Sequence, residues 1–299
     1  MSMETTHLTL EAFLATGPDW ERPLFSNVTV FNEADLYRKL STSETKLLAV
    51  SDGGANQGHG YFGWCLGDQN EIFAEGSGPV FGDSELMSSF RPEAYGKLSI
   101  ARLIARAYEY FQLDPDHLSP QIKSICDNKG ILQRLEKYKL PHRHRRRLPL
   151  KGDSDVCRAI RKTQAQWTHL TYQHVKGHQD STSTVETPLS REATLNIRAD
   201  LLATQFYEKE NKRGLDVTHE QVTPLPDYGA LLTINNRTIT SKHAKLIRAA
   251  AISQDLIAYM DNKYKWKPTI SRTIDWAAHE HSIKQLQPCL LYTSPSPRD

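Results

Sequence analysis

Residues 47–54 read Leu47-Leu-Ala-Val-Ser-Asp-Gly-Gly54, a short apolar run that ends in an acid and a pair of glycines. An apolar run of this length favours a buried strand, and the glycines that follow interrupt it. Open α/β sheets place their sites at the C-terminal ends of such strands. We therefore expect a buried strand over residues 47–52, with Asp52 at its functional end.

Two further apolar segments, residues 61–66 and 71–75, follow after short connections rich in Gly, Asn and Asp. Connections this short favour antiparallel neighbours, so the three segments predict a meander. Helical periodicity follows from Pro92 to Phe111, around residues 131–135 and 156–163, and from Arg191 to Glu208. Strand patterns over residues 121–127 and 170–175 lie between them. The order predicts an α/β fold: a mixed five-stranded sheet, three antiparallel strands then parallel strands, with helices on its faces.

Four acids stand out by their positions in this pattern. Asp52 and Asp127 end two predicted strands, Glu93 opens a helix, and Asp200 lies within the last helix, one turn after Asn196. Each has a structural explanation alone: a turn cap, a favourable first-turn charge, a helix start or a solvated helix position. Acids are costly to bury, so four together at apolar elements point to bound cations or hydrogen-bond donors.

Five short motifs surround these acids. Asp52-Gly-Gly-Ala55, with Phe62-Gly-Trp64 behind it, and Arg91-Pro-Glu-Ala-Tyr95 come first. The later motifs are Cys126-Asp-Asn128, His174-Val-Lys-Gly-His178 and Asn196-Ile-Arg-Ala-Asp-Leu-Leu-Ala203. Together, and in this order, they resemble the motifs of type 1 ribonuclease H. Ser88-Ser-Phe-Arg-Pro-Glu-Ala-Tyr-Gly96 and Val175-Lys-Gly-His-Gln-Asp180 are similar to the ribonuclease H domains of retrotransposon polyproteins.

The resemblance implies a metal-dependent endonuclease that hydrolyses the RNA strand of RNA–DNA hybrids. It implies that Asp52, Glu93, Asp127 and Asp200 bind two Mg²⁺ ions, with Mn²⁺ as a substitute. His178 would shuttle a proton or assist product departure. The 17 residues between His178 and Asn196 make this loop longer than is usual in the family, which affects the placement of His178 more than that of the acids.

Substrate contacts follow from the same resemblance. The family recognises the RNA strand by its 2′-hydroxyl groups in a wide, shallow minor groove. Gly53 and Gly54 lack a Cβ and would allow close backbone approach, and polar contacts to the hybrid are assigned to Ser89, Asn128 and Asn196. Phe90 departs from the pattern, because an amide is common at that position.

The charge of the chain is unevenly distributed. Residues 139–151 hold six Lys or Arg and no acid; removing these charges from the net +2 leaves −4 for the rest. We assign Arg143, Arg145, Arg146 and Arg147 to phosphate contacts with salt-sensitive affinity. A nuclear-localisation signal and a solvated loop are the alternatives.

The ends of the chain differ from its middle. Residues 1–45 form a lead-in of uncertain structure, and residues 46–210 hold the catalytic domain. Residues 222–288 are expected to form a smaller α+β extension, with a hairpin near Asn235-Asn236 and a helix over residues 241–263. This helix is expected to bury an apolar stripe formed by Ala244, Ile247, Ala251, Leu256 and Tyr259. Residues 289–299 resemble a translated sequencing adapter, which would make the chain a fragment that continues beyond Pro288 in the intact gene; a natural Ser/Pro-rich tail is the alternative.

Composition fits an intracellular protein, cytoplasmic or nuclear, without a membrane segment. Residues 1–7 lack the order of a secretory signal, no apolar run approaches about 20 residues, and the four cysteines form no CxxC pair. Expected partners are an RNA–DNA hybrid and a reverse transcriptase domain encoded nearby. The main alternative is a catalytically inactive nucleic-acid-binding remnant of a retroelement polyprotein. Proofreading exonucleases and integrases fit less well, since Asp52 is followed by two glycines and Glu93 lies early in the chain.

Overall fold

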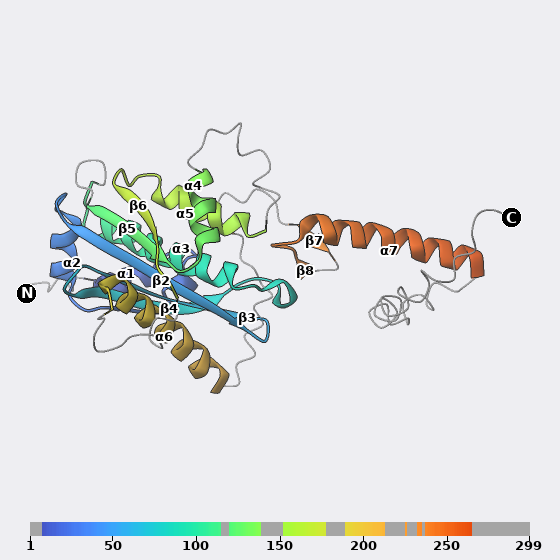
Figure 1. The fold of residues 1–299 in the computed structure, drawn as a ribbon, viewed down its shortest axis with the longest axis horizontal. Helices are drawn as coiled ribbons and strands as arrows, with labels where there is room; N and C mark the ends of the chain where they lie inside the picture. Colours follow the sequence, from blue (N-terminus) through green and yellow to red (C-terminus); the bar gives the residue numbers. More distant parts are fainter. Residues whose placement is uncertain are drawn as a thin grey trace, which may run out of the picture. The chain divides into compact units, whose positions relative to one another are not determined.

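The computed structural model describes residues 8–114, 120–138, 152–177, 189–212, 225, 232–234 and 237–264. Residues 1–243 and 244–299 form two separate compact units. In the first unit, a six-stranded sheet has the order β1-β4-β3-β2-β5-β6 (Figure 1). Its strands are β1 Asn27–Val30, β2 Lys46–Asn56, β3 His59–Gly67, β4 Ile72–Val80, β5 Gln121–Cys126 and β6 Leu170–His174. Its helices are α1 Leu10–Ala15, α2 Glu33–Leu40, α3 Phe90–Tyr110, α4 Lys129–Tyr138, α5 Ser154–Gln164 and α6 Arg191–Lys212, with short 3-10 turns η1 Arg22–Phe25 and η2 Ser84–Leu86.

The expected mixed sheet is confirmed. Strands β2, β3 and β4 pair antiparallel as a meander, and β5 and β6 continue the sheet parallel to β2. This is the arrangement that the resemblance to ribonuclease H implies. The sheet has one strand more than expected, because β1 pairs antiparallel with the edge of β4.

The two faces of β2 bury different helices, as alternation along a strand requires. Leu47 and Ala49 belong to a large apolar cluster that includes residues of α3 and α5. Leu48 and Val50 belong to a smaller cluster with residues of α6. Helices α3 and α5 therefore pack on one face of β2, and helix α6 packs on the other.

The N-terminal residues that we describe as a lead-in are folded from residue 8 onward. Leu10, Leu14, Leu36 and Leu40 of helices α1 and α2 are fully buried in the large cluster. Helix α1 is capped by Thr9 and α2 by Asn32, whose side chains accept backbone N–H bonds. This segment closes the far edge of the sheet rather than leading into it.

The expected C-terminal hairpin and helix are both present, but they belong to different units. The hairpin β7 Thr233–Ile234 and β8 Arg237–Thr238 belongs to the first unit. Helix α7, His243–Tyr264, is the described part of the second unit. The apolar stripe that we expect to be buried on this helix is exposed at Ile247 and Tyr259. None of the described helices combines the length and apolar character that spanning a bilayer requires.

Candidate metal centre

The parallel register of β2 and β5 brings Asp52 and Asp127 together. Val50 pairs with Ile125, and each acid lies two residues further along its strand. The expected strand end at Asp52 is not observed, because β2 continues to Asn56 in its pairing with β3. The parallel pairing with β5 ends at Val50 and Ile125, so both carboxylates lie at the same level just beyond it. Both side chains are half-buried.

Glu93 reaches this edge because Gly53 lets helix α3 cross β2 at very short range. A Cβ built on Gly53 would lie 2.5 Å from the carbonyl carbon of Pro92 and 2.6 Å from the amide nitrogen of Glu93. Both of these atoms are backbone, which cannot rotate away. Glycine at position 53 therefore allows the backbone of α3 at Glu93 to lie in contact with β2.

The three acids form one cluster. Asp52, Glu93 and Asp127 each offer a carboxylate oxygen, and these oxygens lie within 4.8 Å of one another. Three carboxylates from a strand, a helix and a second strand converge although 75 residues of sequence separate the first from the last. Oxygen ligands of this kind are what Mg²⁺ and Ca²⁺ prefer in proteins.

Two asparagines and one backbone amide orient the cluster. Asp52 accepts bonds from the amide of Gly53 at 2.7 Å and from Asn196 Nδ2 at 3.4 Å. Asn128 Nδ2 donates to Glu93 Oε1 at 3.3 Å. The other end of Asn128 caps α4, since its Oδ1 accepts from the amides of Gly130 and Ile131. These hydrogen bonds restrict the rotation of the Asp52 and Glu93 carboxylates in the absence of a ligand.

Glu93 carries the strongest electrostatic signature of the cluster. Burial is the largest cause of its raised pKa, and together with the nearby Asp127 and Asp52 carboxylates it raises the pKa of Glu93 to about 9, against the opposing bond from Asn128. Its Oε2 is buried without a hydrogen-bond partner, and so is Oδ1 of Asn196. Buried acceptors without donors are rare in folded proteins. A cation at the cluster would satisfy Oε2 of Glu93, so the residues present fit a divalent metal ion.

Asp200 lies beside this cluster and not within it. Its side chain is exposed on α6, one turn after the buried Asn196, and the group of three oxygens does not include it. Together with Asp52, it contributes to the raised pKa of Tyr61, for which burial is the largest cause. The fourth acid therefore faces the same side of the molecule. Its part in metal binding stays a prediction.

Helix α6 approaches the sheet at a second close contact. A Cβ on Gly63 of β3 would lie 2.2 Å from the carbonyl oxygen of Ala199. This contact places the turn that carries Asn196 and Asp200 directly against the sheet. The Phe62-Gly-Trp64 motif thus has a packing role that the sequence pattern alone did not reveal.

Arg91 is a structural anchor that sequence reasoning missed. Its guanidinium is 1% exposed and bonds Asp153 at 3.1 Å and Asp155 at 2.9 Å, at the start of α5. A further bond reaches the carbonyl of Phe81. Arg91 therefore pins the first turn of α3, and with it Glu93, to a neighbouring helix. Its place two residues before Glu93 was the available signal.

Gly177 is a second missed residue. A Cβ there would lie 2.3 Å from Asp127 Oδ2, so the loop after β6 touches the carboxylate directly. His174 Nε2 also lies 2.9 Å from the carbonyl oxygen of Asp127. The Val175-Lys-Gly-His178 motif therefore supports the cluster through its glycine.

The remaining predicted site residues have varied surroundings. Ser89 is exposed at the start of α3, and Phe90 packs under the guanidinium of Arg134 at 4.2 Å. The space above Gly54 is filled by the ring of Tyr61, which stacks on Tyr207 at 4.9 Å. The missing Cβ atoms of Gly53 and Gly54 thus serve internal contacts. His178, Arg143, Arg145, Arg146 and Arg147 lie outside the described residues.

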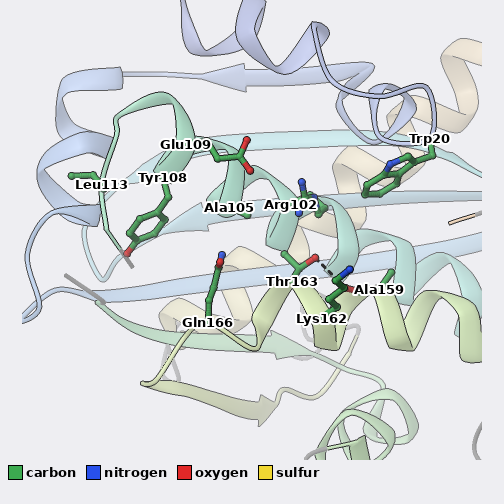
Figure 2. A pocket seen from close by; sticks show the side chains of 10 residues that line it. All are labelled: Trp20, Arg102, Ala105, Tyr108, Glu109, Leu113, Ala159, Lys162, Thr163 and Gln166. Carbon is green, nitrogen blue, oxygen red and sulfur yellow. Dashed lines mark hydrogen bonds between the residues drawn. The ribbon is translucent and has the colours of Figure 1, made fainter. Parts of the chain in front are cut away.

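A separate cavity of about 370 Å³ lies along the C-terminal half of α3, beside α5 (Figure 2). Trp20 and Arg102 form its rim, and Thr163 donates to the carbonyl of Ala159 at 3.0 Å. Arg102 is already paired with the buried Glu21. No acid of the cluster lines this cavity, so it is not the metal centre.

Similarity to known proteins is found among solved structures. No protein-family model matches the chain, and no curated protein sequence matches it. Solved structures are similar to it: RNase H1 from the halophilic archaeon Halobacterium salinarum has 18% identity and a TM-score of 0.36, covering 55% of this chain and 98% of that one. The PFV RNase H domain has 14% identity and a TM-score of 0.35, covering 55% and 94%. LC11-RNase H1 in complex with RNA/DNA hybrid has 18% identity and a TM-score of 0.35, covering 55% and 99%.

Proposed function

We propose that this protein is a metal-dependent nuclease that hydrolyses the RNA strand of RNA–DNA hybrids. The observation that carries the proposal is the convergence of Asp52, Glu93 and Asp127 within 4.8 Å. Buried, unpartnered oxygens on Glu93 and Asn196 support a cation at that position. Divalent ions bound there would supply an activated water and stabilise the leaving oxygen, as in two-metal hydrolysis of phosphodiesters.

The residues of the chain have separate tasks in this proposal. Asp52, Glu93, Asp127 and, from α6, Asp200 hold the metal ions, for which Mg²⁺ is the first choice and Mn²⁺ the second. Asn128 and Asn196 orient Glu93 and Asp52 through the bonds that they donate. His178 would move a proton or assist product departure.

The preference for a hybrid rests on the motif resemblance. The exposed Ser89, the half-buried Asn128 and the backbone of Gly53 and Gly54 would contact the hybrid, whose 2′-hydroxyls mark the RNA strand. Asn196 is buried against Asp52 and would act through that acid. The basic residues Arg143, Arg145, Arg146 and Arg147 would hold phosphates and make the affinity salt-dependent. A reverse transcriptase domain encoded nearby would supply hybrids as its product.

The direct test is cleavage of labelled RNA–DNA hybrid, duplex RNA and duplex DNA by the full chain, with Mg²⁺ and with EDTA. We expect cleavage of the RNA strand of the hybrid alone, and only with the metal. Asp52→Asn and Asp127→Asn should each reduce turnover by about a thousandfold or more while hybrid binding persists, because they remove ligands and not phosphate contacts.

Two outcomes would contradict the proposal. Equal cleavage of all three duplexes would reject the hybrid preference. Hybrid binding without cleavage over a range of Mg²⁺ and Mn²⁺ would favour the inactive remnant, for which the exposed position of Asp200 outside the cluster is the structural argument. Asp35→Asn, on the surface of α2, is a control with the same chemical change and no expected effect on turnover.

A further inference from the structure

A fully buried lysine lies on the inner side of the acidic cluster. Lys97 of α3 has no exposed surface, and it follows Glu93 by four residues, so one helical turn separates the two. Lysine is almost never fully buried unless it is paired. The position of this charge therefore requires an explanation that packing alone does not give.

The hydrogen bonding of Lys97 does not supply a countercharge. Its Nζ donates to Ser124 Oγ at 3.0 Å, and among the described residues no salt bridge joins it to a carboxylate. A hydroxyl is neutral and cannot offset the cost of burying an ammonium group. The compensating negative charge must come from groups further away.

The surrounding elements identify those groups. Residues four apart on a helix lie on the same face, so the side chain of Lys97 neighbours that of Glu93. Its bond to Ser124 also ties it to β5, the strand that leads directly into Asp127. At an effective dielectric of about 20, charges in this setting still interact strongly over several ångströms.

We propose that Lys97 is the internal counter-cation of the acidic cluster, which holds Asp52, Glu93 and Asp127 together before metal binds and lowers their affinity for divalent cations. The inference rests on the proposed metal centre and assigns a positioning residue that contacts neither metal nor substrate. Binding of a divalent ion brings positive charge toward the lysine, so part of the binding free energy is lost to repulsion. The affinity of the site is thereby set below what three carboxylates alone would give.

The test is Mn²⁺ binding to the full chain, measured by electron paramagnetic resonance of the free ion and by calorimetry. Lys97→Met keeps the length of the side chain and removes its charge, so we expect Mn²⁺ to bind about tenfold more tightly or better. Lys46→Met is the matched control: it makes the same charge change on an exposed side chain at the opposite end of β2. We expect it to leave the Kd within about twofold, because solvent screens a distant surface charge. Ser124→Ala removes the partner and keeps the charge, so it should change stability more than metal affinity.

The outcomes separate this inference from the proposed function. If the wild-type chain binds no Mn²⁺, the metal centre itself is wrong. If the wild type binds Mn²⁺ and Lys97→Met binds it with the same Kd, the metal centre stands and the role of Lys97 is overturned. Should Lys97→Met not fold, Lys97→Gln takes its place. The wild type also offers an independent readout, because Mg²⁺ should shift the side-chain NMR signal of Lys97 with the Kd of the site; an unmoved signal would refute the inference.

Discussion

At the scale of single residues, the cluster brings three carboxyl groups together in a partly buried place, where ionising all of them is costly. Glu93 shows the cost most clearly, since burial and two neighbouring carboxylates raise its pKa to about 9. In the unfolded chain the same carboxyl group has an ordinary pKa near 4.5. Between these two values the folded protein binds the proton and the unfolded protein does not.

This difference predicts opposite effects of pH on stability and on metal affinity. Because the folded state holds the extra proton, Glu93 makes the metal-free protein less stable as pH rises from about 5 toward 9. A metal ion needs the ionised carboxylate, so affinity for Mg²⁺ should rise over the same range, by up to about tenfold per pH unit. Calorimetric titrations and thermal melts at pH 6, 7 and 8, with and without Mg²⁺, measure both trends.

Glu93→Gln is the control for this prediction, because the amide keeps the shape of the side chain and does not titrate. Its metal-free stability should lose most of the pH dependence in this range. Its Mg²⁺ affinity should be weak at every pH. An affinity for Mg²⁺ in the wild type that is constant from pH 6 to 8 would contradict the assignment of Glu93 as a buried ligand.

At the scale of elements, the site depends on how α3 is attached to its neighbours. Arg91 joins the first turn of α3 to the start of α5 through Asp153 and Asp155, all three side chains being buried. The φ of Asp153 is +56°, in the left-handed region that non-glycine residues seldom adopt, although Asn and Asp do so more often than most. This strained start of α5 is held by the ion pairs and by a bond from the Asp153 amide to Thr240.

We therefore predict that Arg91→Met destabilises the protein by about 3–5 kcal/mol, because it leaves two buried carboxylates without a partner. Adding Asp153→Asn and Asp155→Asn to the same chain should recover a large part of the loss, since no buried charge then remains. Arg38→Met removes an exposed ion pair with Asp35 on α2 and should cost less than about 1 kcal/mol. Urea denaturation of the three variants measures these differences; equal costs for Arg91→Met and Arg38→Met would contradict the anchor role.

The elements also show how far the sequence predicts this fold. Helices α3 and α6 and strands β2 and β5 carry strong apolar patterns, and the predicted bounds of α3 and β5 agree closely with the structure. The prediction that β2 ends at Asp52 is wrong: the strand continues to Asn56, because Gly53 and Gly54 pair with Phe62 and Tyr61 of β3. Strand β1 has only four residues, Asn-Val-Thr-Val, and none of its side chains is fully buried, so its alternating pattern is too short to predict a strand from the sequence. It exists because β4 offers an open edge. The stripe on α7 fails for the opposite reason: its periodicity is helical, but Ile247 and Tyr259 are exposed.

The candidate site likewise contains residues that the sequence predicts and residues that it does not. The acids could be predicted because motif order and strand ends place Asp52, Glu93 and Asp127 at one edge. The supports could not, because Gly177, Arg91 and Lys97 act on residues far away in the sequence. Their roles depend on pairing between strands and on helix contacts that no local pattern contains.

At the scale of the whole molecule, the boundary of the folded unit lies further along the chain than the end of the ribonuclease H-like motifs. The hairpin β7–β8 is tied back to the first unit: Arg237 bonds Asp83 at 2.5 Å, and Thr240 accepts from Asp153. Leu225 and Ile239 are buried at 4% and 5% exposure. Leu225 and the described residues of 232–234 and 237–243 thus belong to the unit that carries the acids, although they lie outside the recognised motifs.

Two truncations separate the hairpin from the helix that follows it. A chain that ends at residue 243 keeps every contact named above, so its melting temperature should stay within about 2 °C of the full chain, and its hybrid cleavage should persist. A chain that ends at residue 224 loses two buried apolar side chains and the partner of Asp153, so its melting temperature should fall by about 5 °C or more. Because Asp153 also holds Arg91, the shorter chain should bind Mg²⁺ more weakly as well. Equal melting temperatures for the two truncations would show that the hairpin contributes nothing to the fold, and the contact between Thr240 and Asp153 would then have no energetic weight.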